Sequence, residues 1–124
     1  MQKNIKKLIA VYGTLKKGRG NHYHLRNARF VGKHTTPAKF TMYNLGGFPA
    51  ITAEGKTPIK CEIYQIEDDN TLESVYRLEG YTGVRDHPEN WYDTLSIDTP
   101  HGEAEIFYFK KPLKNTTTVP TGEW

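Results

Sequence analysis

Short apolar runs separated by polar turns recur along most of the chain, which is typical of β-strands. Leu8 to Tyr12 is a continuous apolar run that stops at Gly13, and it predicts a buried strand entering a tight turn. Apolar and polar positions alternate between residues 57 and 66, as on a strand with two different faces. Weaker patterns predict further strands over residues 28–32, 38–44, 91–98 and 103–109, and residues 48–52 form a short apolar segment after a turn.

Residues 70–79 have helical spacing instead. Leu72, Val75 and Tyr76 lie at i, i+3 and i+4 and define an apolar face, with Asn70 as a suitable N-cap and Gly80 as a helix end. Many strands and one clear helix predict an α+β fold built on a small, mainly antiparallel barrel with few helices. The 124 residues suit a single domain over residues 1–124, large enough to bury a core without disulfides.

Composition limits the expected partners and cellular location of the protein. The net charge of +3 is mild and does not by itself indicate a nucleic-acid partner. Cys61 is the single cysteine and cannot form an internal disulfide, which favours a reducing, cytoplasmic location. The apolar run at residues 8–11 is too short for a signal peptide or a membrane span, so no membrane partner is expected.

Glu79 is the first candidate for chemistry. It lies at i+7 from Leu72 and therefore continues the apolar face at the last turn of the predicted helix. Apolar neighbours and the negative end of the helix dipole would both raise the pKa of its carboxyl toward neutrality, where a general acid/base works best. A glutamate at the edge of this face could equally point to solvent, and the spacing leaves both interpretations open.

The turn after the first strand is the second candidate. A strand that ends in glycine can leave several backbone N–H groups free, and such groups bind a carboxylate or stabilise an oxyanion. An ordinary turn remains the alternative. Gly13 to Gly20 is not a P-loop, because Arg19 and Gly20 stand where Lys and Ser or Thr are required.

Other polar groups indicate no cofactor. His22 and His24 are too few for a zinc site and have no further ligand at a matching spacing, so no metal is expected. Cys61 shares a predicted strand face with isoleucines, so we expect it to be a buried structural thiol. The basic cluster between Lys3 and Arg19 lacks the interleaved aromatics of a single-strand binder, so no nucleic acid is expected.

Several motifs together resemble the γ-glutamylcyclotransferase-like superfamily. Its opening signature is similar to Tyr12-Gly13-Thr14-Leu15-Lys16 followed by Gly20-Asn21, and its catalytic helix to Leu72 through Leu78-Glu79-Gly80-Tyr81. Phe48-Pro49-Ala50 resembles the apolar segment of the family. Tyr92 and Tyr108 fall where the family has a pocket tyrosine and a late strand tyrosine, and Gly122-Glu123-Trp124 resembles the ending of some members.

The resemblance implies an enzyme that converts a small γ-glutamyl amine or peptide to 5-oxoproline and a free amine without metal or cofactor. Glu79 would be the acid/base, and Tyr12, Gly13, Thr14 and Leu15 would hold the substrate carboxylate. Tyr92 and Tyr108 would also contact substrate. The sequence departs from many members at Thr94, where they have arginine, and has a longer loop over residues 81–91. The alternatives are a module that binds a small anionic metabolite in the same pocket without turnover, and an interaction protein that keeps the fold.

Overall fold

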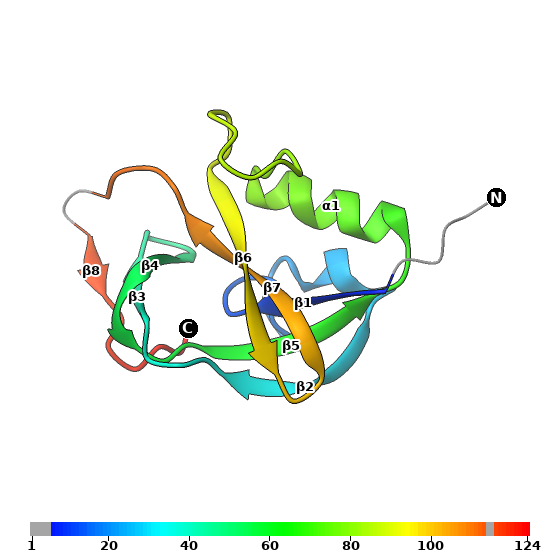
Figure 1. Ribbon diagram of the computed structural model, residues 1–124, viewed down its shortest axis with the longest axis horizontal. Helices are drawn as coiled ribbons and strands as arrows, with labels where there is room; N and C mark the ends of the chain where they lie inside the picture. Colours follow the sequence, from blue (N-terminus) through cyan, green and yellow to red (C-terminus); the bar gives the residue numbers. More distant parts are fainter. Residues whose placement is uncertain (1–5, 114–115) are drawn as a thin grey trace.

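The computed structural model describes residues 6–113 and 116–124, where eight strands, one α-helix and one short 3-10 helix follow one another. Figure 1 shows the helix lying above the strands, with the β3–β4 hairpin at the left. In chain order the elements are β1 (Lys7–Val11), η1 (His22–Leu25), β2 (Arg29–Thr35), β3 (Phe40–Asn44), β4 (Pro49–Thr57), β5 (Lys60–Ile66), α1 (Asp69–Glu79), β6 (Tyr92–Thr99), β7 (Gly102–Phe109) and β8 (Thr117–Thr118).

The strands form two sheets. The larger has the order β2-β5-β1-β7-β6, and the smaller has the order β4-β3-β8. Only β1 and β7 pair in parallel, and the other pairs of the described residues are antiparallel. The predicted α+β fold is confirmed, but the predicted barrel is wrong, because β2 and β6 are the separate edges of an open sheet. Alternation along a strand determines its two faces and says nothing of whether the sheet edges meet.

The larger sheet has an apolar core on each face. Ile9 and Val11 of β1 pack in one cluster with Val75 of α1. The intervening Ala10 packs in a second cluster with Met42 of β3. Because successive strand residues point to opposite faces, β1 serves both cores, and its uninterrupted apolar run follows from this position in the middle of the sheet.

The helix begins earlier than predicted. Its N-cap is Asp68, whose carboxylate accepts a hydrogen bond of 2.9 Å from the Thr71 amide, so the predicted cap Asn70 lies inside the first turn. Asp and Asn can both cap a helix, and which of them does so here depends on where β5 ends. The predicted end is confirmed, since Gly80 has the left-handed φ of 63° that favours glycine.

Two boundaries differ from the sequence-based prediction. The stretch over residues 57–66 is not one strand, because β4 runs to Thr57 and β5 starts at Lys60, with Pro58 between them. No strand was predicted after residue 109, yet the tail contains β8, which pairs with Tyr43 and Asn44. Residues 114 and 115 of that tail lie outside the described part. Among the helices of residues 6–113 and 116–124, none is long and apolar enough to cross a membrane.

Candidate active site

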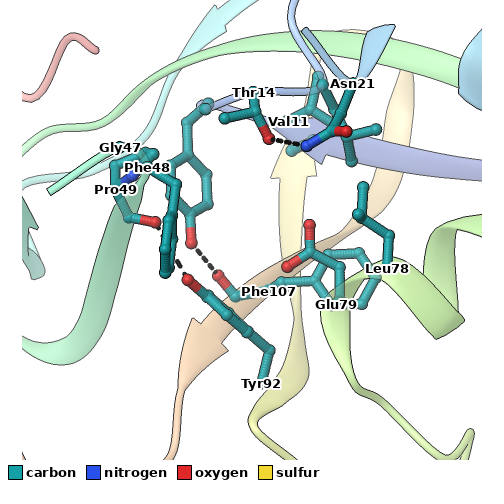
Figure 2. A pocket seen from close by; sticks show the side chains of 14 residues that line it. Val11, Thr14, Asn21, Gly47, Phe48, Pro49, Leu78, Glu79, Tyr92 and Phe107 are labelled. Carbon is teal, nitrogen blue, oxygen red and sulfur yellow. Dashed lines mark hydrogen bonds between the residues drawn. The ribbon is translucent and has the colours of Figure 1, made fainter. Parts of the chain in front are cut away.

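A cavity of about 310 Å³ opens where the end of β1, the end of α1 and the β3–β4 turn meet. This volume is at the lower end of the roughly 300–1,000 Å³ found for small-molecule sites. Figure 2 shows side chains from these elements pointing into the same space. The lining consists of residues 10–15, Asn21, residues 47–49, Leu78, Glu79, Tyr92 and Phe107.

Glu79 supplies the carboxyl group of this cavity. The helix face that carries it packs on the core through Val75, which is fully buried, and this packing turns the last residue of α1 inward. The side chain keeps partial contact with solvent through the cavity. Burial of its carboxyl raises the pKa of Glu79 from its usual 4.5 to about 7. A carboxyl with this pKa can both accept and return a proton near neutral pH.

The Gly13–Lys16 turn forms a second wall of the cavity. The Lys16 amide donates to the Gly13 carbonyl at 3.1 Å, which closes a four-residue turn with Thr14 and Leu15 at its centre. Within the described residues, the amides of Gly13, Thr14 and Leu15 have no hydrogen-bond acceptor. Free amides beside a cavity that also holds a titratable carboxyl can bind the oxygens of a small anion.

Asn21 fixes the orientation of this turn. Its amide nitrogen donates to the Thr14 hydroxyl oxygen at 2.9 Å, and its backbone N–H donates to the Thr14 carbonyl at 3.0 Å (Figure 2). Because the Thr14 oxygen is an acceptor in the first bond, its own proton is available for a ligand. Asn21 was part of the quoted motif, but no local pattern shows that its side chain folds back onto Thr14.

Gly13 makes a close contact with Pro49 that the local sequence does not reveal. A Cβ on Gly13 would lie 2.7 Å from Cγ of Pro49, closer than side-chain atoms normally approach. The space beside Gly13 is therefore occupied by the Pro49 ring. This close approach joins the β1 turn to the β3–β4 turn and so closes one side of the cavity.

Two tyrosines line the cavity and form hydrogen bonds to the backbone of other strands. The Tyr12 hydroxyl donates to the Phe107 carbonyl at 2.6 Å, and the Tyr92 hydroxyl donates to the Pro49 carbonyl at 3.1 Å. Figure 2 shows these two hydrogen bonds on the side of the cavity away from Thr14. Burial, followed by the nearby Tyr92 and Glu79, raises the pKa of Tyr12, so its hydroxyl stays neutral. Both rings line the cavity and hold separate strands at a fixed distance from it.

Tyr108 does not reach the cavity. It follows Phe107 in β7, and neighbouring strand residues point to opposite faces, so only Phe107 lines the cavity. Tyr108 lies beside Lys110, whose ammonium is 6.0 Å from its ring centre, and opposite the fully buried Asp93 of β6. The sequence-based assignment of Tyr108 to the substrate site is therefore not supported by its position, while Phe107 had no sequence signal.

The loop over residues 81–91 is held by buried polar groups. The Asp93 carboxylate accepts hydrogen bonds from the amides of Asp86 and Thr94, at 2.7 and 2.8 Å, and lies 3.8 Å from the Lys110 ammonium. Thr94 is buried and makes a 3.4 Å hydrogen bond to Tyr81. Thr94 thus makes a neutral contact, and the cations near Asp93 are Lys110, which directly follows β7, and Arg85 of the loop, whose Nε lies 4.0 Å from the carboxylate.

The remaining candidates have structural roles. A hydrogen bond of 2.9 Å joins His22 to the Leu15 carbonyl, and one of 2.6 Å joins His24 to Ser74. Cys61 is buried, and burial raises the pKa of its thiol to about 12. In the part of the chain that the structure describes, no group of three or more His, Cys, Asp or Glu side chains could hold a metal ion. Lys3 of the basic cluster lies outside the described residues.

Comparison with known proteins identifies a family for the chain. The profile of the family described as "Gamma-glutamyl cyclotransferase, AIG2-like" matches residues 9–124. The chain belongs to this family. The matched residues include the loop before η1 and the helix that ends at Glu79. All residues that line the cavity therefore lie within the part of the chain that matches the gamma-glutamyl cyclotransferase family.

Individual relatives of the gamma-glutamyl cyclotransferase family align over nearly their full length. A Vibrio cholerae protein that carries gamma-glutamylcyclotransferase as a provisional name is 31% identical over 117 residues, 94% of each chain. The gamma-glutamylcyclotransferase family protein YtfP of Escherichia coli is 28% identical over 94% of each chain. The crystal structure of an uncharacterized Pyrococcus horikoshii protein has a TM-score of 0.74 and 28% identity, covering 94% of this chain and 88% of its own.

Proposed function

We propose that the protein is an enzyme that cyclises a γ-glutamyl amine or γ-glutamyl peptide to 5-oxoproline and releases the free amine. The observation that carries the proposal is the Glu79 carboxyl, which lines the cavity opposite free backbone amides and whose pKa is raised to about 7 by burial. Membership of the gamma-glutamyl cyclotransferase family supports the same reaction class.

The reaction needs no enzyme nucleophile. The substrate's own α-amine attacks its γ-carbonyl carbon, which forms the new C–N bond of a five-membered ring, and the carbon–nitrogen bond to the leaving amine then breaks. Glu79 as carboxylate takes the proton that the α-ammonium must lose, and returns it to the departing nitrogen. One carboxyl group therefore serves as base and then as acid, and it ends the cycle in its starting form.

The remaining requirements are positioning and charge stabilisation. The α-carboxylate of the substrate would be held by the amides of Thr14 and Leu15 and by the Thr14 hydroxyl, since charge-assisted bonds of this kind are stronger than neutral ones. A cavity of this small size would keep the γ-glutamyl chain folded, which brings the amine close to the carbonyl before reaction. Tyr12 and Tyr92 keep the walls of that cavity in place.

The test is a screen of γ-glutamyl compounds for release of 5-oxoproline, with wild type, Glu79→Gln and Glu73→Gln. Loss of general acid/base catalysis should lower turnover at least ~100-fold in Glu79→Gln. Glu73→Gln removes a solvent-exposed carboxylate from the same helix and should keep wild-type turnover. Unchanged turnover in Glu79→Gln would exclude Glu79 from the mechanism. Binding of 5-oxoproline without turnover of any compound would instead indicate the non-catalytic binding module.

A further inference from the structure

Two exposed apolar side chains form the rim of the cavity. Phe48, in the turn that precedes β4, is 44% exposed, and Leu78, in the last turn of α1, is 37% exposed. Figure 2 shows them on opposite sides of the cavity, with the Glu79 carboxyl between them. A single exposed apolar side chain is common on protein surfaces, but two that line one cavity form an apolar surface that a ligand can cover.

The cavity offers little charge to a bound molecule. Among its lining residues in the described chain, Glu79 is the only acid, and there is no Lys, Arg or His. The nearest basic side chains of the β1 turn are engaged elsewhere, because Lys16 and Arg19 donate to the main-chain oxygen of Trp124 at 2.9 and 2.7 Å. An anionic group at the rim would therefore lose water without gaining an opposite charge. A cationic group would also lose water against Phe48 and Leu78, and the one carboxyl nearby, Glu79, is the group that must act on the reacting nitrogen.

The proposed reaction fixes where the leaving amine must lie. Glu79 has to reach the departing nitrogen to protonate it, while the free amides of the Gly13–Lys16 turn hold the other end of the substrate. Any substituent on that nitrogen therefore starts beside the Glu79 carboxyl. The rim between Leu78, the residue before Glu79, and Phe48 on the opposite side lies next to that starting point.

We propose that the Phe48–Leu78 rim binds an uncharged apolar substituent of the leaving amine, so that γ-glutamyl derivatives of alkyl or arylalkyl amines are the preferred substrates. This inference rests on the proposed function and adds the substrate class. Burial of apolar surface against the two side chains provides the binding free energy. The absence of a cation in the described lining disfavours anionic competitors, and the cost of removing water from an ammonium beside two apolar side chains disfavours cationic ones.

The experiment compares three γ-glutamyl amides of similar length that differ in the end group. These are the amides of hexylamine, cadaverine and aminovaleric acid, which end in a methyl, an ammonium and a carboxylate group. We expect kcat/KM for the hexylamine derivative to exceed both others at least ~10-fold, the low end of what a hydrophobic contact contributes to discrimination. Calorimetric binding of the same compounds to Glu79→Gln should rank them in the same order.

Variants then locate the preference. Phe48→Ala and Leu78→Ala should each lower the ratio of kcat/KM for the hexylamine and cadaverine derivatives. Phe48→Arg should raise the relative rate with the aminovaleric acid derivative, because it places a cation at the rim. Val84→Ala is the control, since Val84 is also apolar, is more exposed than Phe48 and Leu78, and does not line the cavity.

The outcomes separate this inference from the proposed function. Turnover of a charged derivative as fast as the hexylamine derivative would overturn the apolar rim and leave the cyclisation standing. Absence of turnover with any compound, combined with tighter binding of the hexylamine derivative that is lost in Phe48→Ala, would overturn the cyclisation and support the apolar site. Absence of both turnover and selective binding would overturn both.

Discussion

Replacing Glu79 by glutamine should change the pH dependence of stability in a way that no surface substitution does. The pKa of Glu79 is about 7 in the folded protein and 4.5 without the influence of the fold. This difference corresponds to at most about 3.5 kcal/mol, at roughly 1.4 kcal/mol for each tenfold change in the dissociation constant. Because the side chain keeps partial contact with solvent, we expect between about 1 and 3 kcal/mol.

The sign follows from proton binding. A carboxyl group whose pKa is raised by folding binds its proton more tightly in the folded protein than in the unfolded chain. The free energy of unfolding therefore falls as the pH rises from 4.5 to about 7, and it stays at the lower value above that range. Glutamine has the same shape and does not titrate, so Glu79→Gln should gain stability relative to wild type across this window.

Urea unfolding of both proteins at about pH 4.5 and about pH 7.5 measures the effect. Subtracting the free energies of unfolding of the two proteins at each pH removes the contribution of the other groups that titrate there. Glu73→Gln, which alters an exposed position of the same helix, controls for the loss of charge. Parallel pH profiles for wild type and Glu79→Gln would refute the burial of the carboxyl. A stability gain confined to low pH would also refute it, because it has the wrong sign.

Further measurements test the rest of the site. Log kcat/KM of the wild type should rise with pH through about 7 as Glu79 ionises, and a flat profile there would contradict its role as base. Gly13→Ala should lower the free energy of unfolding by about 1–3 kcal/mol, because the new methyl group meets the Pro49 ring, and Pro49→Ala should relieve part of that loss. Additive effects in thermal melts of the double variant would argue against this contact. Thr14→Val should weaken binding of 5-oxoproline by no more than about 1–2 kcal/mol, as titration calorimetry can measure, because the backbone donors remain. Turnover should survive exhaustive treatment with a chelator, and loss that one added divalent ion restores would show a metal requirement.

Local patterns in the sequence were sufficient for the elements that carry the site. The apolar run of β1, the i, i+3, i+4 face of α1 and the glycine at its end depend on residues close together in the chain. The same spacing put Glu79 at the end of the apolar helix face but left open whether its carboxyl points inward or to solvent, and the packing of α1 on the core decided this. The pKa of Glu79 was predicted to rise through burial and the helix dipole, and in the structure burial is the cause.

Only the tertiary structure could decide which distant residues meet at Glu79. Alternation assigns Phe107 and Tyr108 to opposite faces of β7 but does not say which face looks into the cavity, and the structure places Phe107 there. The contact between Gly13 and Pro49 and the hydrogen bond from Tyr92 to Pro49 likewise join segments far apart in the chain. The open edges of the larger sheet have the same origin. The spacing of apolar residues and the identity of the adjacent residues can be read directly from the chain. Strand order, register and packing between sheets depend instead on the free energy of the whole fold.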